Sequence, residues 1–118
     1  MKIINSITAP SKDLTEDKIM TGGGVEAKFL IGADIAKELS VGIVKFKPGG
    51  RTKFHVHTSE QVLYCLEGKG IVATEKEEVV VTPGMIIFFP KGENHWHGAT
   101  PDSSFAHLTI MLPYKTIT

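Results

Sequence analysis

The side chains best suited to chemistry in this sequence are five histidines, which all lie between positions 55 and 107. Four of them form two His-x-His pairs, His55 with His57 and His95 with His97. Because alternate residues of a β-strand point to the same face, each pair presents two imidazoles side by side. Neutral imidazoles from neighbouring strands converge readily on manganese, iron, zinc, nickel or copper, and an oxygen ligand can join them. The two pairs therefore predict a site for one divalent transition metal.

The candidate oxygen ligand is Gln61, which follows His57 after a short polar break. Its acidic neighbour Glu60 is the alternative, but that choice shifts the strand by one residue and turns the side chain to the opposite face. We therefore expect Gln61 to face the histidines and Glu60 to point outward. The competing interpretation is that an amide at this position marks a site that has lost its metal.

Short strands are the elements that must position these residues. Apolar and alternating runs bounded by glycine and proline predict strands at 2–7, 25–31, 41–47, 52–57, 61–67, 71–75, 79–82, 85–89, 95–97 and 105–112. Gly68–Gly70 is expected to close a hairpin, and Asp34–Leu39 to form one helical turn or a loop. No useful helical periodicity appears, so the pattern is typical of an all-β sandwich or barrel.

Length and charge narrow the class of protein. A chain of 118 residues has the length of one domain, so we expect a single domain over 1–118. Thirteen basic and 13 acidic residues cancel, which argues against nucleic-acid and membrane partners. The sequence shows neither a signal peptide nor an apolar run of roughly 20 residues. Cys65 is the only cysteine, so no internal disulfide forms and we expect a cytoplasmic protein.

Nine positions at fixed spacing give a family resemblance. They are Gly49, His55, His57, Gln61 and Gly68, followed by Gly84, Pro90, Gly92 and His95. The two runs, at 49–68 and 84–99, resemble the motifs G-x5-H-x-H-x3,4-E-x6-G and G-x5-P-x-G-x2-H-x3-N of the cupin superfamily. Only 15 residues separate them, as in small single-domain cupins. Two positions depart from the motifs, because Gln61 replaces the acidic residue and Ala99 replaces the final asparagine.

The resemblance implies a small jelly-roll β-barrel whose motif histidines point inward and bind one divalent metal. Residues 1–25 would form an N-terminal strand and loop. The resemblance also implies a homodimer, and the exposed strand edges of a small barrel leave surfaces that a second subunit can cover.

A subset of cupins resembles this chain more closely, since it has glutamine at the acidic position and a second motif similar to PKGENHWHGATP. The subset includes manganese-dependent hydroxynitrile lyases and cupins associated with carboxymuconolactone decarboxylases. This resemblance implies that the metal, manganese in the first instance, is held by His55, His57, Gln61 and His95. It places His97 and His107 beside the open coordination positions.

The strand pattern gives His97 and His107 two interpretations each. His97 shares the parity of His95 and should face inward, either at the site or as a core histidine. His107 shares a face with Phe105, Thr109 and Met111. It is a candidate general acid and base because its ordinary pKa is near neutrality, and the alternative is a hydrogen-bonded structural residue.

The ligand set also indicates the chemistry. Three neutral histidines and an amide leave the charge of a divalent ion undiminished, whereas a glutamate would cancel one unit, so the centre is expected to be a stronger Lewis acid. The candidate wall residues are apolar and predict a small, mostly hydrophobic substrate with one oxygen function. They are Leu63, Phe88, Phe89, Trp96 and Met111, each of which has core packing as its alternative. Cys65 either faces the cavity or is a small buried residue.

These features favour an enzyme that uses the metal as a Lewis acid in a lyase, decarboxylase or isomerase reaction. An iron or manganese dioxygenase would use the same ligands. A binding or sensory module without turnover is the third hypothesis, and fold alone does not separate the three.

Overall fold

The computed structural model describes residues 1–113 and 116–117, and strands are the only regular secondary structure in this part of the chain. In chain order they are β1 (Lys12–Asp13), β2 (Met20–Thr21), β3 (Val25–Ile31), β4 (Ser40–Phe46), β5 (Arg51–Thr52), β6 (Val56–His57), β7 (Gln61–Gly68), β8 (Gly70–Thr74), β9 (Glu78–Val81), β10 (Ile86–Phe89), β11 (His95–Ala99), β12 (Phe105–Met111) and β13 (Thr116–Ile117). None of the described residues lies in a helix with the length and hydropathy that a bilayer crossing requires.

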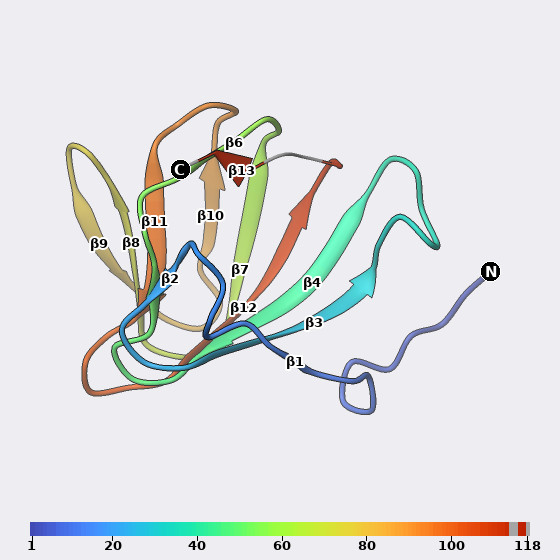
Figure 1. Ribbon diagram of the computed structural model, residues 1–118, viewed down its shortest axis with the longest axis horizontal. Helices are drawn as coiled ribbons and strands as arrows, with labels where there is room; N and C mark the ends of the chain where they lie inside the picture. Colours follow the sequence, from blue (N-terminus) through green and yellow to red (C-terminus); the bar gives the residue numbers. More distant parts are fainter. Residues whose placement is uncertain (114–115, 118) are drawn as a thin grey trace.

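Two antiparallel sheets face each other in a jelly-roll-like sandwich (Figure 1). One sheet has the strand order β1-β3-β4-β12-β7-β10, and the other has the order β2-β5-β11-β8-β9. A small third sheet pairs β13 with β6 at the open end of the sandwich. The all-β jelly-roll architecture expected from the sequence is confirmed.

The core lies between the two sheets and follows the period-2 pattern of the strands. In β7, Gln61, Leu63 and Cys65 are buried while Tyr64 and Leu66 are exposed. Side chains from both sheets complete the apolar cluster, namely Val25, Phe46, Leu63, Cys65, Val72, Val81, Phe89, Ala99 and Phe105. Burial of each larger side chain contributes about 1.5–3 kcal/mol, so this cluster fixes the spacing of the sheets around the histidines.

The turn at Gly68–Gly70 carries the chain from one sheet to the other, so the expected hairpin is wrong. β7 pairs with β10 and β12, whereas β8 pairs with β9 and β11. Gly68 has φ +74°, and a Cβ at this position would collide with the carbonyl of Ser104. Glycine is needed here because the left-handed backbone and the close approach both exclude a side chain.

Two further expectations differ from the structure. The predicted strand at 2–7 is absent, and residues 5–9 form a turn closed by a hydrogen bond from Ala9 N to Asn5 O of 3.0 Å. The predicted strand at 52–57 is divided into β5 and β6, with His55 making an isolated bridge to His95. Asp34–Leu39 is a loop of turns, which is one of the two expected alternatives.

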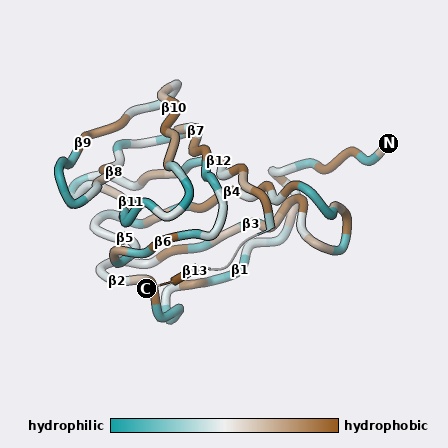
Figure 2. Tube along the Cα trace, turned by 90° about the horizontal axis from the view of Figure 1, so that it is seen from above, coloured by the Kyte–Doolittle hydropathy of each residue, from teal (hydrophilic) through white to brown (hydrophobic). Residues whose placement is uncertain are grey.

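The N-terminal segment projects from the body of the sandwich (Figure 2). Lys28 on β3 anchors it, since Nζ donates hydrogen bonds to the carbonyls of Ser6 at 2.6 Å and Ile7 at 3.2 Å. The side chains of Ile3 and Ile7 nevertheless remain 87% and 84% exposed. Apolar side chains in this segment therefore have little contact with the rest of the chain.

Candidate metal centre

Both sheets contribute histidines to one end of the space between them. His95 and His97 alternate on β11, while His107 lies on β12 of the opposite sheet. His55 lies beside His95, to which its backbone is joined by hydrogen bonds of 2.9 and 3.0 Å. The nitrogens of His55, His95 and His97 that can bind metal lie within 4.8 Å of one another, and all three residues are buried. This cluster can hold a metal ion.

Backbone carbonyls fix the orientation of two rings in the cluster. Nδ1 of His55 lies 2.8 Å from the carbonyl of Lys53, and Nδ1 of His95 lies 2.9 Å from the carbonyl of Glu93. A carbonyl only accepts hydrogen bonds, so each Nδ1 carries the proton and each Nε2 presents a lone pair. Both Nε2 atoms are therefore ready to bind a cation.

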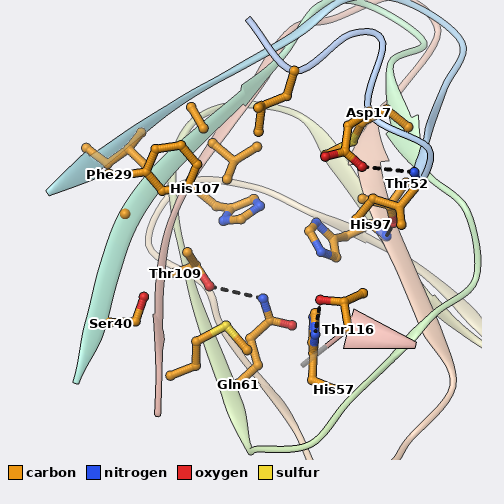
Figure 3. Close-up of a pocket in the computed structure, with 18 of the residues that line it drawn as sticks. Asp17, Phe29, Ser40, Thr52, His57, Gln61, His97, His107, Thr109 and Thr116 are labelled. Carbon is orange, nitrogen blue, oxygen red and sulfur yellow. Dashed lines mark hydrogen bonds between the residues drawn. The ribbon is translucent and has the colours of Figure 1, made fainter. Parts of the chain in front are cut away.

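His57 stands beside this cluster. Its ring centroid lies 4.7 Å from that of His55 and 5.4 Å from that of His95. Its Nδ1 lies 3.1 Å from the hydroxyl of Thr116 on β13 (Figure 3). The trio whose nitrogens lie within 4.8 Å of one another thus contains His97 and not His57, although the His57 ring is a neighbour of both His55 and His95.

Gln61 extends from β7 toward the same rings. Its Oε1 lies 3.1 Å from Nε2 of His95, and its Nε2 donates to the hydroxyl of Thr109 at 3.0 Å (Figure 3). Gln61 is buried while Glu60 is exposed, as strand parity predicts. An amide oxygen thus lies next to the imidazole lone pairs.

Burial keeps the histidines neutral. It is the main cause that lowers the pKa of His57 to about 3, and of His95 and His107 to about 4. It also lowers the pKa of His55 and places that of His97 well below its usual range, where charge on the neighbouring histidines acts in the same direction. Neutral imidazoles are the form that binds metal, so the donor set fits a divalent transition ion.

His97 and His107 face each other across the cavity (Figure 3). Their ring centroids are 4.9 Å apart at an interplanar angle of 74°. Within the described part of the chain, Nδ1 of His97 and both ring nitrogens of His107 have no partner with full hydrogen-bond geometry. The backbone of Leu108 interacts with the His107 ring weakly and raises its pKa against the larger effect of burial. A buried polar atom without a partner costs about 1–3 kcal/mol, so this pair suits a polar group that enters the cavity.

The cavity that these residues line has a volume of about 390 Å³. His55, His57, Gln61, His97 and His107 form its polar end. The remaining wall comes largely from residues 12–20, β3 and β4, through Leu14, Met20, Ala27, Gly42 and Val44. The charged residues Lys12, Asp17, Lys18 and Lys28 also line it. A small molecule with an apolar body and a polar group matches this lining.

The family follows from a comparison with known sequences. The pattern of the family described as Cupin domain matches residues 42–111 of the chain. This protein is a member of the cupin family. The two histidine pairs, the glutamine and the jelly-roll sheets are thus parts of a cupin domain.

Among known proteins, this cupin is similar to (R)-mandelonitrile lyase from Granulicella tundricola. The two are 41% identical over 68 residues, which are 57% of this chain and 52% of the lyase. The cupin therefore spans about half of the length of that relative.

Two solved structures resemble this cupin along most of its length. A cupin-like protein from Thermotoga maritima is 29% identical and has a TM-score of 0.77, over 84% of this chain and 79% of its own. The polyketide cyclase RemF from Streptomyces resistomycificus is 22% identical and has a TM-score of 0.84, over 100% of this chain and 86% of its own. The second likeness shows the fold alone.

Most of the apolar candidates for the cavity wall of this cupin take their alternative position in the core, as Leu63, Phe89 and Trp96 do. Of the five candidates, only Met111 lines the cavity. Leu63 is fully buried in the core, Phe88 is 54% exposed, and Trp96 lies beneath the Arg51 guanidinium, whose carbon is 3.5 Å from the ring centroid. Phe89 instead stacks on His95 with ring centroids 3.9 Å apart. Cys65 belongs to the core cluster, which is one of its two expected positions.

Two polar residues of the site were not assigned a role from the sequence. Thr109 orients the Gln61 amide, and Thr116 contacts His57 from near the end of the chain. Strand parity already placed Thr109 on the face of His107, so this signal was present. For Thr116 the sequence held no such signal, because its position depends on the pairing of β13 with β6.

Proposed function

We propose that this cupin is an enzyme that holds one divalent metal with His55, His57, Gln61 and His95. The support is that His55, His57 and Gln61 are buried and line one cavity, and that the amide oxygen of Gln61 lies 3.1 Å from Nε2 of the buried His95. Manganese is the first metal to test, and the same donors accept iron, zinc, nickel and copper. When bound, such an ion supplies Lewis-acid polarisation of a substrate oxygen.

The observation that carries the enzymatic proposal is the buried pair of His97 and His107. Ring nitrogens of this pair that have no hydrogen-bond partner among the described residues face the cavity next to the candidate ligands. The His107 pKa of about 4 is below the near-neutral value expected from the sequence and makes neutral His107 a weak base. It would take a proton from a substrate hydroxyl only if the metal lowered the pKa of that hydroxyl, and the protonated ring would then return the proton readily. His97 then orients the substrate or shares that proton.

A lyase reaction on a small hydroxylated substrate fits this arrangement best. The similarity to (R)-mandelonitrile lyase supports a cyanohydrin as the first substrate class to test. His107 removes the hydroxyl proton, the bond between the carbinol carbon and the nitrile carbon breaks, and the proton passes to the leaving cyanide. The products are an aldehyde and hydrogen cyanide, and the apolar part of the wall, with Leu14, Met20 and Val44, can receive the aldehyde's apolar body.

The activity is tested by incubating manganese-loaded protein with mandelonitrile and following benzaldehyde by its absorbance. We expect release above that of chelator-treated protein. Equal rates for loaded and chelated protein would contradict the proposed reaction on this substrate, and an isomerase or decarboxylase panel would follow. Oxygen uptake in the same mixture would instead favour a dioxygenase.

We also propose a homodimer that forms through the outer face of the larger sheet. Two apolar rows cross four strands of that face, with neighbours set by the strand register. The first row is Ile86, Tyr64, Leu108 and Ile43, and the second is Phe88, Val62, Ile110 and Val41. Solvated sheet faces normally carry polar residues at such positions, so a partner surface is expected here.

A second copy of this chain is the partner that would cover both exposed apolar surfaces of the monomer. The outer face exposes Ile86 and Phe88, and the projecting N-terminal segment exposes Ile3 and Ile7. A twofold arrangement covers each face with the same face of its neighbour and lets each N-terminal segment reach the other subunit. The buried free thiol of Cys65 is consistent with a cytoplasmic location, which we propose for this dimer.

A further inference from the structure

The hydrogen-bond geometry around Gln61 contains a contact between two acceptors. Nδ1 of His95 gives its proton to the carbonyl of Glu93, so Nε2 of the neutral ring has only a lone pair. This Nε2 lies 3.1 Å from Oε1 of Gln61, which is also an acceptor. No proton is available between the two atoms, so the contact is unfavourable unless a cation lies beside both.

The other end of the amide determines this orientation. Nε2 of Gln61 donates to Oγ1 of Thr109 at 3.0 Å, which points Oε1 toward His95 (Figure 3). Thr109 lies in the middle of β12, where it pairs with Gly42 on one side and Leu63 on the other. Its backbone is therefore held firmly between β4 and β7, and the hydroxyl provides a fixed partner for the amide.

We propose that Thr109 is a positioning residue for Gln61, and that the amide turns over when the metal leaves. This inference rests on the proposed metal site. With the metal bound, Oε1 faces it and Nε2 donates to Thr109. Without the metal, Nε2 donates to Nε2 of His95, and the Thr109 hydroxyl donates to Oε1. In each state the amide oxygen and one amide N–H of Gln61 then have a partner.

Glutamine and threonine are suited to this exchange. The oxygen and nitrogen of an amide have nearly the same size, so a half-turn about the last side-chain torsion leaves the packing unchanged. A hydroxyl can donate or accept, so Thr109 serves both states. A glutamate would present acceptors at both ends and could not close the empty site with a hydrogen bond to His95. The amide thus lets the site release its metal without leaving the oxygen of Gln61 opposite the lone pair of His95.

The test uses the fact that Gln61 is the only glutamine in the chain. Labelling glutamine side chains with nitrogen-15 gives a single amide resonance pair in the wild-type protein. Calorimetry first establishes zinc binding, because zinc is diamagnetic and suits the spectra. If zinc does not bind, and manganese and iron do not bind either, the proposed metal site fails and this inference falls with it.

In zinc-loaded protein we expect the amide protons to show Overhauser contacts to the Thr109 methyl group. After chelation the contacts should move to the His95 ring, and in protein whose histidines are also labelled with nitrogen-15 a nitrogen–nitrogen coupling should appear across the new hydrogen bond. An amide that keeps the same partner while zinc binds and leaves would overturn this inference, and the proposed metal site would still stand.

Variants of Thr109 separate positioning from a structural role. In zinc-loaded Thr109→Val the amide loses its acceptor, so exchange of its protons with water should quicken about tenfold, the scale of one hydrogen bond. Thr109→Ser should restore slow exchange. In the metal-free protein the same proton bonds to His95, so Thr109→Val should leave its exchange unchanged. Equal acceleration in both states would contradict the proposal.

Discussion

His97 and His107 approach from opposite sheets until their ring centroids are 4.9 Å apart, with His107 completely buried. Neither sheet alone would create this pair, because β11 and β12 belong to different layers of the sandwich. The pair therefore depends on the core that sets the distance between the sheets. Phe46 and Phe105 flank His107 with ring centroids 6.0 and 5.6 Å away and hold it in place.

Replacing His107 tests its role in proton transfer. We expect His107→Ala to lower turnover by about a hundredfold or more at unchanged metal content, since a positioned acid and base contributes roughly 10²–10⁴-fold. His107→Gln retains a hydrogen-bonding group of similar reach but does not carry the proton, so it should lose as much. Steady-state rates and metal analysis of both variants check this. Full activity in the glutamine variant would assign His107 a structural role.

Acid should weaken the metal-free fold. The folded-state pKa is about 3 for His57 and about 4 for His95 and His107, whereas the unfolded value is about 6.5. Because these pKa values are lowered, the unfolded state takes up protons first. The stabilisation is complete above about pH 6.5 and is lost as the pH falls toward these folded-state values, by about 1.4 kcal/mol per pH unit for each group.

Thermal unfolding of chelator-treated protein between about pH 8 and about pH 4.5 measures this effect. The midpoint should fall steadily on the acid side. His107→Phe removes one of the titrating groups, so its midpoint should depend less steeply on pH. Midpoints that do not change with pH would show that the histidines are not held neutral in the fold.

The sequence predicted the inner face of the site well. Period-2 alternation placed Gln61 inside and Glu60 outside, and both positions are confirmed. The same rule turned His107 inward on β12. These positions follow from local strand geometry, which a short stretch of sequence is enough to specify.

Local strand geometry could not predict which residues line the cavity. Val44 and Ala27 reach the site because β4 and β3 continue the sheet beyond β12. Leu14 and Met20 reach it because residues 12–20 run along the cavity. Likewise, the Gly68–Gly70 turn looks like a hairpin in sequence but connects two layers. Which strands pair is decided by long-range packing, which residue spacing does not encode.

Substituting Gln61 by glutamate should raise metal affinity and reduce the Lewis acidity of the centre. The carboxylate cancels one unit of the ion's charge, which strengthens binding but weakens polarisation of a substrate oxygen. Calorimetric titration with manganese and turnover of the Gln61→Glu variant check both effects. Weaker metal binding in the variant would contradict the role of residue 61 as a ligand.

The oligomeric state tests the apolar outer face. Light scattering after size exclusion should give twice the mass of one chain. Ile86→Lys combined with Phe88→Lys should yield monomers, because each charge lies within an apolar row. Val80→Lys, an equally exposed apolar position on β9 of the other sheet, is the matched control and should remain dimeric. Monomeric wild-type protein would contradict the proposed dimer.

The central claim is that the buried imidazoles bind one metal ion, and elemental analysis of protein purified without chelators tests it most directly. We predict about one equivalent of a divalent first-row metal per chain, as a single site of this ligand type requires. His55→Ala should lose the metal, and His107→Ala should keep it. Metal-free wild-type protein that also fails to bind added manganese, iron or zinc would contradict the account, as would unchanged metal content in His55→Ala.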